Sequence, residues 1–267
     1  MSPLLSPAGH VAYFVRTGDG GFLPQRACAG AWNPEELHIS PVNGLLLHEL
    51  ERWLANRKHG GKFVTRISYD YLGVLDFTRC EVAFELLRPG RAVELVEGIL
   101  SQHGRPVLRA RVWLLATQDT SAVAGGAREP LSPPEDGRPF ALTRVWPGDY
   151  VASVDMRVLE GPVPGSTTAW LTTPLAIVEG DTVSDLARFA LLVDTSNGIA
   201  VRRRPEEWQF PNVDLTIHLF RQPVGHWIGF DTRVVFGPTG HGLTSSDLFD
   251  QHGHVGHAEQ ILLVRPR

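Results

Sequence analysis

Cysteine is scarce in this chain of 267 residues, which contains only Cys28 and Cys80. The two residues show no Cys-x-x-Cys spacing and form no disulfide framework, so we expect both to be reduced thiols. Blocks of basic residues are missing too: the triplet Arg202–Arg203–Arg204 is the single basic run, and the net charge is −4. This balance argues against a nucleic acid or another polyanion as the partner.

A long apolar run is also lacking, because no stretch of hydrophobic residues reaches the length needed to cross a bilayer. The first residues do not follow the charged-then-apolar pattern of a secretory signal. With 43% hydrophobic and 20% charged residues, the composition matches that of an ordinary soluble globular protein. The length suffices for one large domain or two smaller ones. We therefore expect a cytoplasmic protein without a membrane partner.

What the chain does contain is one order of elements that occurs twice. Runs of β-forming residues, separated by turn residues, predict six strands in each half. In the first half these segments are 10–17, 22–32, 63–73, 79–90, 91–104 and 105–116, and in the second they are 150–161, 166–175, 212–223, 226–237, 241–253 and 254–264. Each half also contains one helical stretch after its second strand. The order in each half is therefore two strands, one helix and four strands.

The two helices are expected from apolar residues at helical spacing. Residues 40–57 begin with Ser40, a good N-cap, and Pro41, whose missing N–H does no harm in a first turn. Residues 181–198 begin with an Asp-Thr pair, either member of which can cap a helix, and carry a second apolar stripe. We expect each helix to be buried by a sheet that curls around it.

A repeated tripeptide supports the duplication. Gln-His-Gly occurs at 102–104 and again at 251–253, each time between the last two strands of a half. Residues 118–149 are dense in Gly, Pro, Ser and charge, which predicts a linker with few contacts. We therefore expect an N-terminal domain at 1–117 and a C-terminal domain at 150–267, packed like two fused protomers in an α+β fold.

The element order resembles the tandem, or double, hotdog fold, in which each half is an antiparallel sheet curled around one long helix. Residues 213–266 look like the last domain of acyl-CoA thioesterase II and its thioesterase-like relatives. The family's Asp-x-Ser/Thr-x-x-x-x-Arg pattern is Asp214, Thr216 and Arg221 here. A Trp-containing strand follows, and a Val-x-x-x-x-Gln setting occurs at 255–260. The resemblance extends over about 10–266, by topology alone in the first half.

The resemblance implies hydrolysis of a coenzyme A thioester, with an acyl-CoA of the kind handled in fatty acid metabolism as substrate. It implies no metal or redox cofactor, and it makes a homo-oligomer possible. In this family an Asp and a Gln form the hydrolytic site together with a Thr on the strand between them. Our alignment assigns Asp214 and Gln260 to the first two positions, and Val235 occupies the place of the Thr.

The residues themselves allow this site and a plainer interpretation. Alternation along 213–220 places Asp214, Thr216 and His218 on one face of their strand, and a solvated face is the ordinary alternative. As a site, Asp214 would be the base that activates water, with Thr216 beside it. Gln260 would orient the water or the carbonyl, and it needs partners because an unpaired buried amide costs about 1–3 kcal/mol.

An oxyanion needs hydrogen-bond donors, and the first turn of a helix leaves backbone N–H groups unpaired. The helix starts near Asn43–Gly44 and near 182–183 are therefore candidates. We expect Asn43 and Gly44 to contact the substrate, since a glycine allows close approach, although it is also simply tolerated in a first turn.

Other interpretations of the polar residues stay open. Asp194 lies one turn beyond Ala190 on the stripe of the second helix and is a rival base, although an Asp there also suits a helix end. The residues His252, His254 and His257 could suggest a metal, but histidines at a surface turn are the favoured interpretation.

Other functions stay open too. The pair Asp214 and His218 lacks the Asn-Pro and the spacing of hotdog enoyl hydratases, which makes that enzyme class the weaker one. A hotdog protein that binds an acyl thioester or another apolar ligand without hydrolysing it would fit the Val at 235. A purely structural partner protein would show no ligand-dependent thermal shift.

Overall fold

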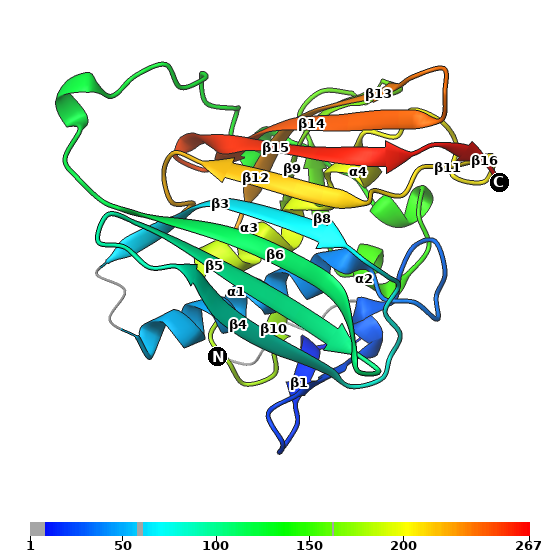
Figure 1. Cartoon of the computed structure of the whole chain (residues 1–267). Helices are drawn as coiled ribbons and strands as arrows, with labels where there is room; N and C mark the ends of the chain where they lie inside the picture. The colour runs from blue at the N-terminus through cyan, green and yellow to red at the C-terminus, as the bar shows by residue number, and fades with distance from the viewer. Residues whose placement is uncertain (1–8, 58–60, 162) are drawn as a thin grey trace.

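The computed structural model describes residues 9–57, 61–161 and 163–267, and a continuous sheet of 14 strands forms its centre (Figure 1). The strands of the first half are β1 (Ala12–Arg16), β2 (Phe22–Pro24), β3 (Lys62–Tyr71), β4 (Cys80–Arg88), β5 (Val93–Gln102) and β6 (Arg105–Ala116). Those of the second half are β7 (Arg138–Pro139), β8 (Asp155–Val158), β9 (Ser166–Thr172), β10 (Ala176–Val178), β11 (Trp208–Gln209), β12 (Asp214–Leu219), β13 (Ile228–Phe236), β14 (His241–Asp250), β15 (Gly253–Leu263) and β16 (Arg265–Pro266). The α-helices are α1 (Ile39–Ala55), α2 (Asp149–Ala152), α3 (Asp185–Val193) and α4 (Ser196–Ile199).

The large sheet has the same strand order on both sides of a central junction. Outward from β3 the neighbours are β6, β5, β4, β2 and β1, and outward from β12 they are β15, β14, β13, β9 and β8. The junction itself is antiparallel and runs from Asp214 opposite Asp70 to His218 opposite Arg66. The sheet thus repeats one order of strands, and the α+β class expected from the sequence is confirmed.

Helices α1 and α3 lie together against one face of this sheet (Figure 1). The residues of α1 from Ser40 to His48 are all buried, because the sheet covers the helix on one side and α3 covers it on another. Gly44 makes the contact between the helices close, since a Cβ there would lie 2.7 Å from Cβ of Leu191. Within the part of the chain that the structure describes, no helix has the length and apolar character to span a membrane.

The single helix predicted for 181–198 is wrong, because α3 and α4 divide it. Ser184 caps α3, with its Oγ accepting from the N–H of Ala187. Asp194 and Thr195 lie between the two helices. Their side chains bond residues from elsewhere in the fold, since Asp194 accepts from Asn212 and Thr195 bonds the hydroxyl of Tyr150. The first helix also starts earlier than predicted, with His38 as its N-cap in place of Ser40.

Two further predictions need correction. The strand expected at 150–161 is a short helix, α2, followed by β8, and the strand β10 was not predicted. The expected linker is exposed at every position up to residue 130, and beyond it exposed and buried residues alternate. Beyond it Pro134, Leu142 and Trp146 are buried, and the carbonyl of Ser132 accepts from Nε1 of Trp170. The end of this segment is therefore packed onto the second half.

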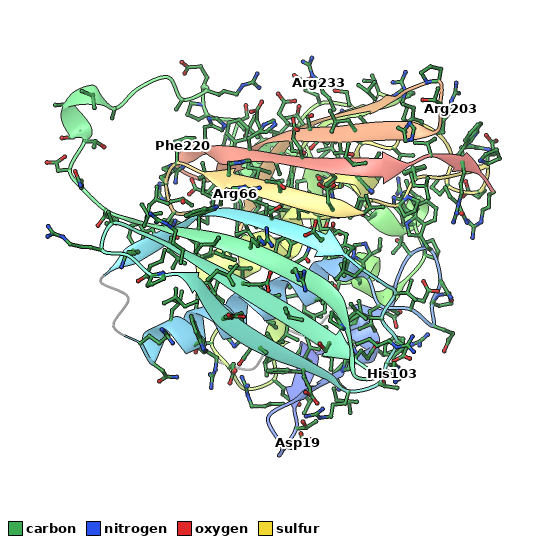
Figure 2. The ribbon with its side chains drawn as sticks, in the orientation of Figure 1. Asp19, Arg66, His103, Arg203, Phe220 and Arg233 are labelled. Atoms are coloured by element: carbon green, nitrogen blue, oxygen red, sulfur yellow. The ribbon has the colours of Figure 1, made fainter. Side chains whose placement is uncertain are left out.

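The repeated tripeptide marks equivalent hairpins but is offset by one residue. Gln102 ends β5, and the turn to β6 is formed by Gly104 and by His103, which is labelled in Figure 2. The φ angles of His103 and Gly104 are positive, at 53° and 71°. In the second half β14 ends at Asp250, and Gly253 already begins β15. Since Gln102 pairs with the first residue of β6, and Asp250 with the first residue of β15, these two residues are the structural equivalents.

Gln102 and Asp250 also have the same structural role, because each side chain bonds the backbone of a loop that precedes a strand. The amide of Gln102 bonds the backbone of Asp76 and Thr78, in the loop before β4. The carboxylate of Asp250 accepts from the N–H of Val224, in the loop before β13. The halves thus fix the loop before a neighbouring strand in the same way, with different side chains.

Candidate active site

Asp194 is the centre of a buried polar cluster. Only 3% of this residue is exposed. Its Oδ1 accepts hydrogen bonds from Nδ2 of Asn212 at 2.7 Å, the hydroxyl of Tyr71 at 3.1 Å and Nε2 of Gln260 at 3.1 Å. Its Oδ2 accepts from Oγ of Ser40 at 3.2 Å. Four side-chain donors therefore surround one carboxylate.

The cluster joins both halves of the chain. Ser40 lies in the first turn of α1 and Tyr71 ends β3, so the first half supplies two donors. Asp194 follows α3, Asn212 precedes β12, and Gln260 lies in β15. Most of these residues are at the ends of elements, where helix and strand termini from the two halves meet.

Gln260 is held at both ends of its amide. Its Nε2 donates to the backbone oxygen of Asp194 as well as to the carboxylate, each at 3.1 Å. Its Oε1 accepts from Oγ of Ser196 at 2.7 Å. Both Gln260 and Ser196 are buried. The amide expected to need partners has a complete set, all of them around Asp194.

Burial and hydrogen bonding act on Asp194 in opposite directions. Burial raises the pKa of its carboxyl above the usual range, while Asn212, Tyr71, Ser40 and Gln260 lower it by stabilising the charged form. Burial and the nearby carboxylate raise the pKa of Tyr71 well above its usual range, which keeps that hydroxyl a donor. The result is a carboxyl group that binds a proton more readily than an exposed one.

A cavity of about 470 Å³ opens beside the cluster. Asp194, Asn212 and Tyr71 line it together with His38 and Trp32. Other lining residues come from the loop before α1, from residues 142–151 and from the segment before β12, and they include Ala31, Leu37, Ile39, Leu142, Trp146 and Pro211. Glu36, Gln209 and Arg265 line it as well. The cavity therefore combines apolar side chains with a few polar groups, among them the buried carboxylate, which is the usual character of a small-molecule site.

The structure does not bring Asp214 and Thr216 to Gln260. Oδ1 of Asp214 accepts from the backbone N–H of Ile261 at 2.7 Å, and Oγ1 of Thr216 bonds Oγ of Ser68 at 3.1 Å. Both lie on the face of β12 opposite to its buried residues.

Figure 2 shows Arg66, which pairs with His218 on that same face, on the side of the sheet turned away from α1 and α3. The alternation along β12 was predicted correctly, but its polar face is the outer one.

Val235 does not occupy the site either. It is 61% exposed on β13, whereas its neighbour Val234 is buried. Val234 pairs with Thr244, which pairs with Gln260, so the buried face of these strands carries Val234 and the outer face carries Val235. Asn212, which lies just before β12, contacts the carboxylate together with Tyr71 and Gln260, and no pattern in the sequence predicted it.

Asn43 and Gly44 also differ from their expected role. Both are buried in the second turn of α1, where their N–H groups belong to the helix. Gly44 serves the contact with Leu191 described above. Asn43 acts behind the cavity wall, because its Nδ2 donates to the hydroxyl of Tyr71 at 2.8 Å and Tyr71 donates to Asp194. Asn43 thereby orients one donor of the carboxylate.

Of the late histidines, His254 bonds the carbonyl of Gly256 and His257 bonds the carboxylate of Asp247, which also lies 3.7 Å from Nε2 of His254. Among the described residues, His48, Glu49 and Asp181 do lie close enough together to hold a metal ion.

Arg16 and Arg52 pair with both carboxylates of that group. Two guanidinium groups already neutralise the acidic side chains, so the group is a structural ion-pair network rather than a cation site.

Comparison with solved structures defines the class of the fold. A hot dog fold protein from Alicyclobacillus acidocaldarius superimposes with a TM-score of 0.72 at 13% identity, covering 92% of this chain and 93% of the other. An acyl-CoA thioesterase II from Mycobacterium marinum gives 0.63 at 15% identity, covering 95% and 96%. The tesB protein of Mycobacterium avium subs paratuberculosis gives 0.64 at 17% identity, also covering 95% and 96%. The chain therefore has a hotdog fold.

Family comparison gives the particular group. Residues 29–115 match the acyl-CoA thioesterase N-terminal domain, and residues 127–264 match the acyl-CoA thioesterase C-terminal domain, which alone spans more than half of the chain. The search of the curated proteins found no significant match. The chain belongs to the acyl-CoA thioesterase family, and it is a thioester hydrolase.

Proposed function

We propose that this protein hydrolyses an acyl-CoA to the free acid and coenzyme A, with Asp194 rather than Asp214 as the base. The observation that carries the proposal is the buried Asp194 carboxylate, which is bonded to Gln260 and lines the cavity. Asp214 lies on the outer face of the sheet and bonds the backbone of Ile261, so it has no path to a ligand in that cavity. The proposal keeps the expected hydrolysis by an activated water molecule and assigns the base to Asp194 in place of Asp214.

Asp194 and Asn212 together can orient a water molecule. Oδ1 of Asp194 already accepts three hydrogen bonds, whereas Oδ2 accepts one, so Oδ2 has room for a proton of the water. Nδ2 of Asn212 is engaged by Asp194 and by the backbone oxygen of Asp214, which leaves its Oδ1 to accept the second proton. The water oxygen then presents a lone pair to the thioester carbon.

In the first step the water oxygen bonds to the carbonyl carbon, its proton passes to Asp194, and the carbonyl π electrons move to the oxygen. In the second step the tetrahedral intermediate collapses, the carbon–sulfur bond breaks, and the coenzyme A sulfur takes the proton from Asp194. The carboxylate is regenerated, and no co-reactant other than water is consumed. Gln260 keeps the carboxylate and the residues around it in position through both steps.

The mirrored strand order supports the further proposal that two hotdog units have been fused. Ser40 and Tyr71 from the first unit then complete a site whose acid lies in the second. The alternative of a protein that binds but does not hydrolyse rested on Val235, and that residue lies outside the site. The geometry therefore favours catalysis.

The test is release of coenzyme A thiol from short, medium, long and aromatic acyl-CoAs. We expect Asp194→Asn to lower kcat by about 100- to 10,000-fold, because it removes the base. Asp214→Asn is the matched control, since an Asn oxygen still accepts from Ile261, and it should keep the wild-type rate. Equal loss in both variants, or loss in Asp214→Asn alone, would contradict the assignment of Asp194.

A further inference from the structure

His38 lies at the start of α1 and lines the same cavity as Asp194. Its Nδ1 accepts a hydrogen bond from the backbone N–H of Ser40 at 3.2 Å, so this side chain caps the helix. A neutral imidazole carries one proton, and a nitrogen that accepts cannot hold it. The cap therefore places the ring proton of His38 on Nε2.

The ring is also fixed in orientation and charge. It stacks on the ring of Tyr150, with centroids 4.1 Å apart and planes 26° apart. Tyr150 is itself held by a hydrogen bond of 2.6 Å between its hydroxyl and Oγ1 of Thr195. Burial lowers the pKa of His38 to about 3, so the imidazole is neutral over the range in which enzymes normally work.

His38 and Asp194 are neighbours but not an acid–base pair. Nδ1 of His38 and Oδ2 of Asp194 are 4.0 Å apart, which is too far for a hydrogen bond. Ser40 lies between them, donating its N–H to His38 and its hydroxyl to Asp194. His38 with its proton on Nε2 cannot take a proton from a substrate, so in this site it is a donor.

The Nε2–H donor of His38 is available to a ligand. Within the described residues it makes no hydrogen bond, and 19% of the side chain is exposed. Donors in largely buried positions are normally paired with an acceptor. The cavity that His38 lines is where such an acceptor would be found.

We propose that His38 is a second catalytic residue, whose Nε2–H donates a hydrogen bond to the carbonyl oxygen of the bound thioester. The inference rests on the proposed hydrolysis by Asp194. During attack that oxygen gains the π electron pair, and a fixed neutral donor stabilises it with no proton transfer. The N-terminus of the 17-residue helix α1 adds a partial positive charge at the same place.

Two substitutions separate this role from the helix cap. His38→Asn keeps an oxygen that can accept from the N–H of Ser40, but it removes the Nε2–H donor on the far side of the ring. His38→Gln places an amide N–H close to the former Nε2. We expect His38→Asn to lower kcat by about 100- to 1,000-fold with little change in KM, as for loss of one oxyanion donor. His38→Gln should restore part of the rate.

The measurements are kcat and KM for both variants with the best acyl-CoA, together with thermal unfolding. If the wild type hydrolyses acyl-CoA and His38→Asn retains its kcat, the proposal for His38 is overturned while the role of Asp194 stands. A rise in KM alone, with kcat unchanged, would equally overturn it. A lowered kcat in a variant with unchanged unfolding temperature, partly restored in His38→Gln, supports it.

A ketone analogue tests His38 even if the wild type proves inactive. In S-(2-oxopropyl)-coenzyme A a methylene group separates the carbonyl from sulfur, so the compound cannot be hydrolysed. We expect its bound carbonyl stretch to lie at lower frequency with the wild type than with His38→Asn. An identical band in the two proteins would overturn the hydrogen bond, whereas absent turnover would overturn the proposed function only.

Discussion

At the scale of the residue, the burial of Asp194 has a consequence for stability. Burial raises the pKa of the carboxyl in the folded chain above its unfolded value. The folded state then binds the proton more tightly than the unfolded state, so the ionised form above that raised pKa destabilises the fold. Asp194→Asn removes the charge, keeps one oxygen for the three donors on Oδ1, and can donate to Ser40.

We therefore expect the Tm of Asp194→Asn to equal or exceed that of the wild type at pH 8. The difference should shrink as the pH falls through the raised pKa of Asp194, because the wild type then also becomes neutral there. Thermal unfolding from pH 4 to pH 8 measures this directly. A variant clearly less stable at pH 8 would mean that the charged hydrogen bonds outweigh the burial of the charge.

The residues around Asp194 also show what could and what could not be predicted from the sequence. Alternation placed Asp214 and Thr216 correctly on one face of β12, but alternation does not tell which face meets the ligand. Asp194 and Asn212 lie just outside regular elements, where no periodicity applies, and they meet only through the packing of both halves. Gln260 was found through the resemblance to the family, and its position in an apolar run agreed with that assignment because a buried amide needs partners.

At the scale of the element, the contact of α1 with α3 depends on Gly44. A methyl group at this position would lie 2.7 Å from Cβ of Leu191, so the helices must separate to accept it. We expect Gly44→Ala to lower the free energy of unfolding by about 1–3 kcal/mol, although alanine is the better helix former. Denaturant unfolding gives this quantity.

Two further variants control that measurement. Gly18→Ala adds the same methyl group where nothing lies within 4 Å, and it should leave the free energy of unfolding nearly unchanged. The double variant Gly44→Ala with Leu191→Gly should lose less than the two single losses combined, because removal of Cβ of Leu191 makes room for the added methyl group. Simple additivity of the two losses would show that the helices do not meet through this pair.

Elements with long periodic patterns were the predictable ones. The strands β3 to β6 and β12 to β15 fall within about four residues of their predicted ends, and α1 does so too. Strand β10 was not predicted because it has only three residues, which is too short for a periodic pattern. It is stabilised by parallel pairing with β1, which is far away in the sequence. The break after α3 was missed since its cause, the bonding of Asp194, is tertiary.

At the scale of the whole molecule, the polar site extends across the two halves. Tyr71 ends β3 in the first half and donates to Asp194 of the second, so the protonation of the proposed base depends on a residue more than a hundred positions away. Tyr69 lies two residues earlier, and its hydroxyl bonds the backbone of Asn43 at 3.3 Å without touching the carboxylate. The two tyrosines are therefore a matched pair of hydroxyls, one fully buried and one beside the cavity, with different expected effects.

We expect Tyr71→Phe to raise the pKa of Asp194 further, because one donor to the charged form is lost. The acid limb of kcat/KM should then move to higher pH, while in Tyr69→Phe it should stay at the wild-type position. Tyr71→Phe should lose about 1–3 kcal/mol of stability, because Nδ2 of Asn43 loses its acceptor, whereas Tyr69→Phe should lose less because the carbonyl of Asn43 keeps its bond within α1. The pH profile is therefore the readout that tests the base. If both variants shift the limb equally, or neither does, the hydroxyl of Tyr71 does not tune the base, and the first half serves only as support.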